Sequence, residues 1–207
     1  MKALLLCGGE GTRLRPFTHT QPKALLPIGY QPILFYILDA LAETAIREVV
    51  IIIGPNGTPI RALLQQTNPW GFKFTFISQP EPLGLAHTVL LARAALGDDS
   101  FLMYLGDNIL AEPLRPLIDR FTQEQPDALL LLREVKNPRD FGVAQVDGAR
   151  VRQVEEKPEQ PRSNLALVGI YLFSPTIHHA VSKIKPSRRG ELEITDAIDR
   201  LVRAGQH

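Results

Sequence analysis

Unbroken apolar runs recur along the chain and predict the strands of a sheet. They are rich in leucine, valine and isoleucine, and they cover residues 3–7, 49–53, 101–105 and 128–132. Apolar runs of this length, without polar alternation, are typical of parallel strands buried on both faces. The four segments are therefore expected to form a parallel sheet in the interior of the protein.

Helical periodicity separates these runs. Residues 33–46 carry an apolar stripe with the 3.6-residue period of a helix, and residues 85–96 and 114–121 show the same spacing. Strand and helix alternate, which is the pattern of βαβ units. The sequence thus predicts an α/β fold, with a Rossmann-like mixed, mostly parallel sheet flanked by helices.

After residue 140 the strands become shorter. Residues 142–146, 151–154 and 167–173 predict strands separated by Asp147-Gly148 and by a proline-bearing stretch, which favours an antiparallel insertion. A last helix is expected from about Glu191. The chain shows no linker, repeat or low-complexity segment, so 207 residues predict a single domain.

Charge and cysteine content narrow the class of protein. The chain has 23 Lys and Arg against 22 Asp and Glu, and a net charge of +1 argues against a nucleic-acid or membrane-surface partner, so phosphate recognition must be local. The single Cys7 excludes an intrachain disulfide and fits a reducing compartment. No apolar run approaches the roughly 20 residues of a membrane span or the core of a signal peptide. A soluble cytoplasmic protein is expected.

A glycine-rich turn follows the first predicted strand. Residues 8–16 read GGEGTRLRP, at the carboxyl end of a strand where open α/β sheets bind ligands. Main-chain N–H groups in such a turn can converge on an anion, and an arginine adds charged donors. The turn lacks the Lys-Ser or Lys-Thr pair of a Walker loop and the third glycine of the dinucleotide fingerprint. A tight turn into a helix is the alternative. The candidates for a triphosphate cradle are Gly8, Gly9, Gly11, Thr12 and Arg13.

Two further charged residues lie where they could contact a phosphate or a metal ion. Lys23 lies among prolines and apolar residues that would hold its stem while the ammonium group reaches polar surroundings. Asp107 follows strand 101–105 through one glycine, which places a carboxylate at the edge of the sheet, and carboxylate oxygens suit Mg²⁺. A solvated lysine and a turn-forming or helix-capping aspartate are the alternatives.

Residues 8–16 and 22–28 together resemble the signature of the glucose-1-phosphate thymidylyltransferases, also called dTDP-glucose pyrophosphorylases. Further blocks resemble the same family in the same order. They are residues 79–86, 105–108, 141–143, 155–158 and 190–196. The blocks span nearly the whole chain, and their order and coverage carry the resemblance.

The resemblance implies a sugar nucleotidyltransferase with dTTP and glucose 1-phosphate as substrates. A sugar-phosphate oxygen would attack the α-phosphorus of dTTP with Mg²⁺ bound, giving dTDP-glucose and pyrophosphate without a covalent enzyme intermediate. By the same resemblance the catalytic residues are Arg13 and Lys23, which contact the triphosphate, and Asp107, which binds the metal. Positioning and charge stabilisation would then dominate catalysis.

The resemblance also assigns the remaining binding positions. Gln79 and Gly84 match base-binding positions, since the amide offers a donor and an acceptor to a pyrimidine edge and the glycine lets the base lie against backbone. The sugar-phosphate-binding positions are Gly142, Glu156, Lys157 and Leu167. Residues 1–140 would form the nucleotide-binding half and residues 141–207 the sugar-phosphate-binding half.

Two neighbouring residues, Leu85 and His87, are left out of the expected site, whereas Glu191 and Glu193 could serve the sugar side but have a simpler explanation. Leu85 is interpreted as core packing and His87 as a surface residue. Glu191 and Glu193 are explained by the positive end of a helix dipole, because they are expected in the first turn of the last helix.

The chain departs from the family pattern in one respect. Family members continue past the last helix into a Trp-x-Asp-x-Gly block whose aspartate is the second carboxylate on the metal, and this sequence stops at His207 without it. We expect a truncated piece with weak or absent synthesis that the downstream segment restores. A natural short form is the alternative.

Other functions remain open. A relative could use UTP, CTP, ATP or GTP, or another hexose 1-phosphate such as mannose 1-phosphate. A noncatalytic nucleotide-sugar sensor or partner subunit could keep the cradle without the metal pair. The family resemblance further implies a homo-oligomer.

Overall fold

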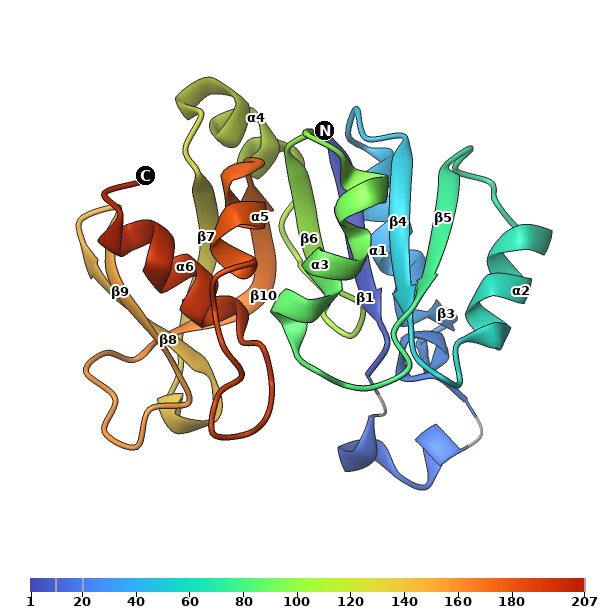
Figure 1. The fold of residues 1–207 in the computed structure, drawn as a ribbon. Helices are drawn as coiled ribbons and strands as arrows, with labels where there is room; N and C mark the ends of the chain where they lie inside the picture. The colour runs from blue at the N-terminus through green and yellow to red at the C-terminus, as the bar shows by residue number, and fades with distance from the viewer. Residues whose placement is uncertain (10, 20, 207) are drawn as a thin grey trace.

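A mixed sheet with helices on both faces forms the molecule (Figure 1). The structure is a computed structural model that describes residues 1–9, 11–19 and 21–206, with Arg13 described by its backbone alone. The described residues include an eight-stranded sheet in the order β5-β4-β1-β6-β10-β8-β9, with β7 also paired to β10. Its strands are β1 (Lys2–Cys7), β4 (Glu48–Ile53), β5 (Lys73–Ser78), β6 (Phe101–Leu105), β7 (Ala128–Glu134), β8 (Gly142–Asp147), β9 (Arg150–Glu156) and β10 (Leu165–Phe173).

The other elements cover the sheet or extend from its edge. Strands β2 (Pro27–Ile28) and β3 (Gln31–Pro32) form a small separate hairpin. The α-helices are α1 (Ile33–Ala42), α2 (Thr58–Gln66), α3 (Leu85–Leu96), α4 (Arg115–Glu124), α5 (Thr176–Val181) and α6 (Ile194–Arg203). Short 3₁₀ turns are η1 (Thr12–Leu14), η2 (Phe17–His19), η3 (Lys23–Leu25) and η4 (Pro138–Asp140).

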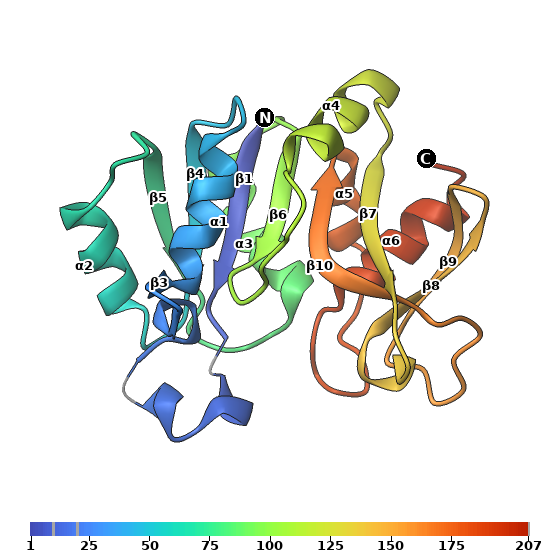
Figure 2. The ribbon, with the colours of Figure 1, turned by 180° about the vertical axis from the view of Figure 1, so that it is seen from behind.

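Strands β5, β4, β1 and β6 are mutually parallel, as their continuous apolar sequences predict for β1, β4 and β6. Their carboxyl ends therefore share one edge of the sheet, where the loop with η1 and η2 projects at the bottom of Figure 1 and, from behind, of Figure 2. Because ligand-binding loops of α/β sheets follow the carboxyl ends of strands, this edge is the place to search for a site.

The strand predicted over residues 128–132 is present, but it does not pair with a parallel neighbour. Strand β7 is half-buried along that run and pairs antiparallel with β10, which is itself antiparallel to β6. Strand β7 therefore runs in the same direction as β6, but β10 lies between the two. A continuous apolar run indicates burial and does not specify which strand will be its neighbour.

Among the strands and α-helices, β2, β3, β5, α2 and α5 have no counterpart in the sequence prediction, and α1 is shorter than expected. Strand β5 alternates exposed and half-buried residues, as an edge strand does, and α2 and α5 are short. Helix α1 ends at Ala42 instead of residue 46, because the Thr44 hydroxyl donates to the Leu41 carbonyl at 2.7 Å and closes the last turn.

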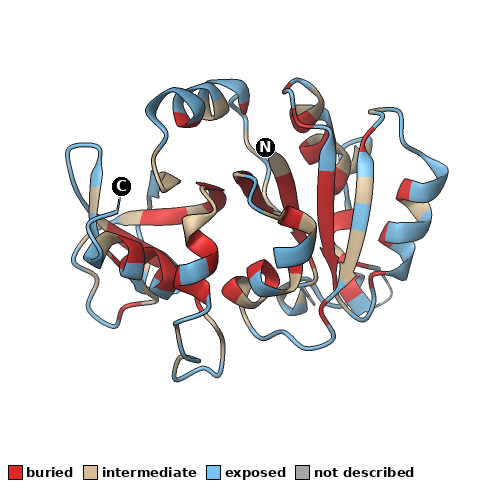
Figure 3. Ribbon diagram, turned by 45° about the horizontal axis from the view of Figure 1, so that its top comes forward, coloured by how far each residue is buried: buried red, intermediate tan, exposed pale blue. Residues whose placement is uncertain are grey.

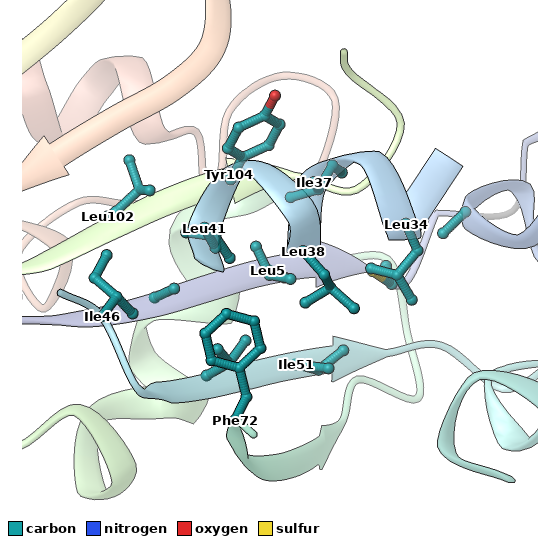
Figure 4. Close-up of a cluster of buried hydrophobic side chains, with 14 of the residues drawn as sticks. Leu5, Leu34, Ile37, Leu38, Leu41, Ile46, Ile51, Phe72, Leu102 and Tyr104 are labelled. Atoms are coloured by element: carbon teal, nitrogen blue, oxygen red, sulfur yellow. The ribbon is translucent and has the colours of Figure 1, made fainter. Parts of the chain in front are cut away.

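Each face of the sheet has its own apolar core. Alternate residues of β1 serve the two faces, since side chains alternate along a strand. On one face Leu5 packs with α1, α2 and α4, and Figure 4 shows Leu34, Ile37, Leu38 and Leu41 of α1 above Leu5 and Ile51. On the other face Leu4 and Leu6 pack with α3, α5 and α6. Figure 3 shows the buried residues concentrated in the strands and on the inner sides of the helices.

The predicted antiparallel insertion is confirmed. Strands β8 and β9 form a hairpin whose turn holds Gly148 at φ +60°, and β8 pairs antiparallel with β10. A left-handed backbone conformation of this kind is typical of glycine in a hairpin turn. In the part of the chain that the structure describes, no helix is both long and apolar enough to cross a bilayer.

Candidate active site

The glycine turn after β1 folds back against the segment that carries Lys23. Gly11 has φ +61°, and a Cβ atom there would lie 2.8 Å from Thr18 Cγ2 and 3.2 Å from Lys23 Cβ. The Thr18 hydroxyl donates to the Gly11 carbonyl oxygen at 2.8 Å. Glycine is therefore required both by the backbone conformation and by the close approach. The turn leads into the 3₁₀ turn η1 and no α-helix follows it directly.

A second loop meets the glycine turn at the carboxyl end of β4. A Cβ atom at Gly54 would lie 2.5 Å from the Gly8 carbonyl oxygen, so the two loops are in backbone contact. Gly9 has open space on its side-chain face, and Thr12 is exposed. A small pocket lies between the two loops and is lined by Cys7, Gly8, Gly9, Thr18, Pro22 and the loop from Gly54 to Gly57. No sequence motif marks the loop after β4.

Lys23 and Asp107 form an ion pair at this edge of the sheet. Lys23 Nζ donates to Asp107 Oδ2 at 2.6 Å, with 31% and 36% of the two side chains exposed. The buried neighbours Ala24 and Leu25 hold the short turn η3 that begins at Lys23. Gly106 brings Asp107 beside β1, because its N–H donates to the Leu6 carbonyl at 2.9 Å. The structure thus brings together two residues that the sequence identified separately.

The environment of Asp107 fits a magnesium ion that is held largely by substrate. Mg²⁺ in phosphate-binding sites takes one or two carboxylates and completes its shell with phosphate oxygens and water. Asp107 offers a partly exposed carboxylate, and across the described residues no group of three or more His, Cys, Asp or Glu side chains forms a ready-made metal cage. The backbone of Arg13 lies in η1, whereas its side chain is outside the described part of the chain.

Strand β10 braces the turn that carries Asp107. Asn108 donates from its side-chain amide to the Val168 carbonyl, and Gly169, at φ +77°, lies so close that a Cβ atom would meet Leu105 at 2.3 Å. This contact coincides with a register shift in β10 between Leu167 and Tyr171. The carboxylate at the end of β6 is therefore held in place next to the strand that contains Leu167.

Gln79 lies beside the glycine turn and contacts Gly84. Gln79 is only 8% exposed, and its main-chain N–H donates to the Ile53 carbonyl at 2.8 Å. Its Nε2 donates to the Gly84 carbonyl at 3.3 Å and lies 3.1 Å from His87 Nδ1. A Cβ atom on Gly8 would lie 3.3 Å from Gln79 Oε1, so the amide oxygen points toward the glycine turn.

His87 is a residue that the sequence interpretation set aside. It is half-buried and contacts the Gln79 amide, instead of standing on the surface. Neither its spacing nor its position in an apolar helix marks it, because the contact is made across the loop that precedes α3. Leu85, interpreted as core packing, is partly buried and packs against the core on that face of the sheet.

The loop before α3 is tied to the loop before α6 by backbone hydrogen bonds. Leu192 N–H donates to the Leu83 carbonyl at 2.8 Å, and Ala86 N–H donates to the Leu192 carbonyl at 3.0 Å. Gly84 adopts φ +97° at this crossing, and a Cβ atom there would lie 2.4 Å from the Leu192 oxygen. The expected base-binding positions are thereby fixed to the C-terminal part of the chain.

Three of the four expected sugar-phosphate positions meet at the start of β8. A Cβ atom on Gly142 would lie 3.2 Å from Glu156 Oε2, 3.3 Å from Leu167 Cδ1 and 2.7 Å from Thr195 Cγ2. Thr195 donates to Glu156 Oε2 at 3.2 Å. Burial, and then the nearby Glu193 carboxylate, raise the pKa of Glu156. Lys157, the fourth position, has φ +41° and its N–H donates to the Phe141 carbonyl at 3.0 Å.

The interpretation of Glu191 and Glu193 as first-turn residues is wrong, because α6 begins at Ile194 and Glu193 only precedes it. Glu193 is buried, and that burial raises the pKa of its carboxyl group. Arg189 pairs with Glu191 at 2.7 Å, with Glu193 at 3.4 Å and with Glu156 at 3.5 Å. These residues belong to the charged cluster around Glu156, which only the folded loop assembles.

The molecule is an α/β protein whose sheet is covered by helices on both faces. A glycine turn, a basic group and a carboxylate lie at the carboxyl edge of its parallel strands, where open α/β sheets bind ligands. The family model described as Nucleotidyl transferase matches residues 2–207. The chain belongs to the nucleotidyl transferase family.

Individual relatives agree with this assignment. Over 207 residues the chain is 50% identical to a glucose-1-phosphate thymidylyltransferase of Streptomyces griseus, covering 100% of this chain and 58% of that protein. The chain likewise spans 58% of the length of two further curated relatives.

Solved structures share the fold. A putative glucose-1-phosphate thymidylyltransferase from Bacillus anthracis, in complex with a sucrose, superposes with a TM-score of 0.90 at 35% identity and covers 99% of this chain and 84% of that one. A UDP-glucose pyrophosphorylase complexed with UDP-glucose gives a TM-score of 0.90 at 25% identity, covering 100% of this chain and 88% of that one. The mixed, mostly parallel sheet flanked by helices is therefore the fold of nucleotidyltransferases.

Proposed function

We propose that the chain binds dTTP and glucose 1-phosphate and forms dTDP-glucose and pyrophosphate. The observation that carries this proposal is the contact between Lys23 and Asp107 beside Gly11, which gathers a cation, a carboxylate and a glycine turn at one sheet edge. The name of the Streptomyces griseus relative supports the choice of substrates. Cytoplasmic location and a homo-oligomeric state are part of the same proposal.

The first step is to hold the triphosphate. The main-chain N–H groups of the glycine turn would face its oxygens, and the Lys23 ammonium would oppose their charge. The turn residues in this role are Gly8, Gly9, Gly11 and Thr12, with Arg13 added on the resemblance. Reaction between two phosphorylated anions needs such fixed positive charge, because their repulsion is strong in a partly dry site.

Asp107 would hold Mg²⁺ together with phosphate oxygens. The ion, when bound, supplies positive charge that offsets repulsion between the two substrates and stabilises the departing pyrophosphate. Lys23, whose ammonium group lies beside the Asp107 carboxylate, would contact the phosphates from the same side. The protein's contribution is to orient the nucleophile and the α-phosphate, since no side chain need form a covalent intermediate.

Residues 141–207 would hold glucose 1-phosphate, and residues 1–140 the nucleotide. Gly142, Glu156 and Leu167 meet at the start of β8, where the glycine lets the other two side chains come close to the backbone. A Glu156 carboxylate can accept hydrogen bonds from sugar hydroxyls, and Lys157 would pair with the sugar phosphate. The bonds between Leu83, Ala86 and Leu192 hold this side against the base loop.

UTP is the second candidate nucleotide. The structural similarity to a UDP-glucose pyrophosphorylase favours it, and uracil offers the same Watson–Crick edge to Gln79 as thymine. The two bases differ by a methyl group that the amide of Gln79 does not contact by hydrogen bonding.

The test is a panel of nucleoside triphosphates and hexose 1-phosphates. We expect calorimetry to show Mg²⁺-dependent binding of dTTP, and long incubations with glucose 1-phosphate to yield dTDP-glucose and pyrophosphate in equal amounts. The panel contains UTP, CTP, ATP and GTP, and mannose 1-phosphate. Binding of nucleotide sugar without any pyrophosphate release would favour a sensor or partner subunit. If the chain binds none of the triphosphates, the proposal is refuted.

A further inference from the structure

We propose that His87 is a positioning residue that fixes the orientation of the Gln79 amide and thereby favours bases with a ring N–H over bases with a ring acceptor. The inference rests on the proposed function, in which Gln79 faces the nucleobase. It adds a selection mechanism based on a residue that neither the motifs nor the family comparison singled out.

The hydrogen bonds around Gln79 determine which end of its amide faces the ligand. The Gly84 carbonyl can only accept, so the atom 3.3 Å from it must be the amide nitrogen. The same nitrogen lies 3.1 Å from His87 Nδ1, and two donors cannot bond to each other. His87 must therefore accept at Nδ1 and carry its ring proton on Nε2.

This arrangement uses both hydrogens of the Gln79 amide nitrogen. One goes to the Gly84 carbonyl and the other to His87 Nδ1, which leaves Oε1 as the free polar group. Oε1 points toward Gly8, next to the glycine turn. The site therefore presents an acceptor, and only an acceptor, from Gln79.

An acceptor at this place discriminates between pyrimidines. Thymine and uracil carry a hydrogen on N3 and can donate to Oε1, whereas N3 of cytosine is an acceptor and would face another acceptor. Without His87 the amide would lose one of the two partners that hold its nitrogen away from the ligand. It could then rotate by 180° about its terminal bond and offer a donor to cytosine.

Because Gln79 is buried, the orientation of its side-chain amide affects which ligands can bind. Gln79 is only 8% exposed, so water cannot readily satisfy an amide that faces the wrong way. An unsatisfied buried polar group costs far more than a solvated one, and sites built around such groups reject ligands that leave them unpaired. A single hydrogen-bond acceptor on His87 can therefore influence base choice.

The experiment compares the affinities for dTTP and dCTP of four variants of the full 207-residue chain, by calorimetry with Mg²⁺. His87→Leu removes the acceptor, and His87→Asn keeps one, because asparagine Oδ1 is as many bonds from Cα as histidine Nδ1. Gln79→Leu removes the base contact itself. His179→Leu is the matched control, since it makes the same change at an exposed histidine on α5.

We expect His87→Leu to reduce the preference for dTTP over dCTP about tenfold, in line with the loss of one hydrogen bond in a buried site. His87→Asn should keep the preference within about threefold of the unmodified chain, and His179→Leu should leave it unchanged. A general loss of folding would lower both affinities together and leave their ratio intact, so the ratio and the rescue by asparagine report positioning.

Other outcomes distinguish a failure of the His87 inference from a failure of the proposed function. If Gln79→Leu abolishes the preference while His87→Leu retains it, the role of His87 is refuted and Gln79 remains the base contact. If Gln79→Leu retains the preference, both the His87 inference and the assignment of Gln79 fail. Absence of dTTP binding by the unmodified chain would overturn the proposed function itself.

Discussion

Lys23 and Asp107 stand 84 positions apart in the chain, yet their side chains meet at 2.6 Å. About a third of each side chain is exposed, and ion pairs in that setting contribute roughly 0–1 kcal/mol to folding. A contact that adds so little to stability leaves both side chains available for the phosphate and metal roles proposed for them. The two residues were identified from separate patterns, and their pairing could not be derived from either.

Lys23→Gln should separate binding from stability. We expect the Kd for dTTP to rise about 10- to 100-fold, because a charged hydrogen bond to phosphate is lost, while the free energy of unfolding changes by less than about 1 kcal/mol. Calorimetry and urea unfolding measure the two quantities. Lys73→Gln is the matched control, since Lys73 forms an exposed ion pair with Glu48 at 3.4 Å away from the site. Unchanged dTTP affinity in a folded Lys23→Gln variant would exclude the lysine from triphosphate binding.

The loops before α3 and α6 are in backbone contact. This contact, called the crossing below, decides how the expected base-binding and sugar-phosphate positions face each other. Leu192 makes backbone hydrogen bonds with Leu83 and Ala86, and Gly84, at φ +97°, lies against the Leu192 backbone. The sequence marks Gly84 as a backbone-approach position but attributes the approach to a ligand. In the structure the approaching group is the Leu192 backbone, so this glycine serves the assembly of the site as well as any base.

Gly84→Ala should therefore destabilise the protein more than the same change in another left-handed turn. Gly148→Ala is the control, because Gly148 has φ +60° and open space where its Cβ would be, whereas a Cβ on Gly84 would lie 2.4 Å from the Leu192 oxygen. Both variants incur backbone strain of about 1–3 kcal/mol, and Gly84→Ala adds a backbone clash. Urea unfolding should show the larger loss for Gly84→Ala, with weaker binding of dTTP and glucose 1-phosphate. Equal losses would show that the crossing is not tightly packed.

At the scale of the whole molecule, one buried group links stability to pH. His178 lies on α5 with its ring stacked on Phe101 of β6, centroids 5.6 Å apart. Neither ring nitrogen has a hydrogen-bond partner among the described residues, and the residue is 9% exposed. Burial, and then the nearby Arg93 charge, lower the pKa of His178. The folded state therefore binds this proton less readily than the unfolded state.

The sign of the pH effect follows. Below the ordinary histidine pKa of about 6.5 the unfolded chain gains a proton that the folded protein resists, so stability should fall as the pH drops from about 6.5 toward the lowered pKa. His178→Leu should remove this part of the slope and raise stability at neutral pH by about 1 kcal/mol, because it deletes unpaired buried polar atoms. Urea unfolding between pH 5 and 8 tests both effects. His179→Leu, at the exposed neighbour, should leave the slope in place; if both variants share one slope with the unmodified chain, His178 is not its source.

Local patterns in the sequence determined the strands β1, β4 and β6, the hairpin of β8 and β9, and the loops in which the candidate residues lie. These features follow from short-range physics, because burial requires apolar runs and tight turns require glycine. The family resemblance, which rests on the order of several such blocks, was confirmed by the match of residues 2–207 to the nucleotidyl transferase family model.

Tertiary structure alone decided which of these pieces meet. The pairing of β7 with β10, the ion pair of Lys23 with Asp107 and the ion pair of Arg189 with Glu156 all join segments that are distant in the chain. The contact of His87 with Gln79 is closer in sequence, and the path of the loop between them decides it. An amino-acid pattern specifies what a residue can bond with, but its partner is chosen by the path of the backbone through the whole sheet. The residue types of the candidate site could therefore be predicted from the sequence, whereas the contacts between them could not.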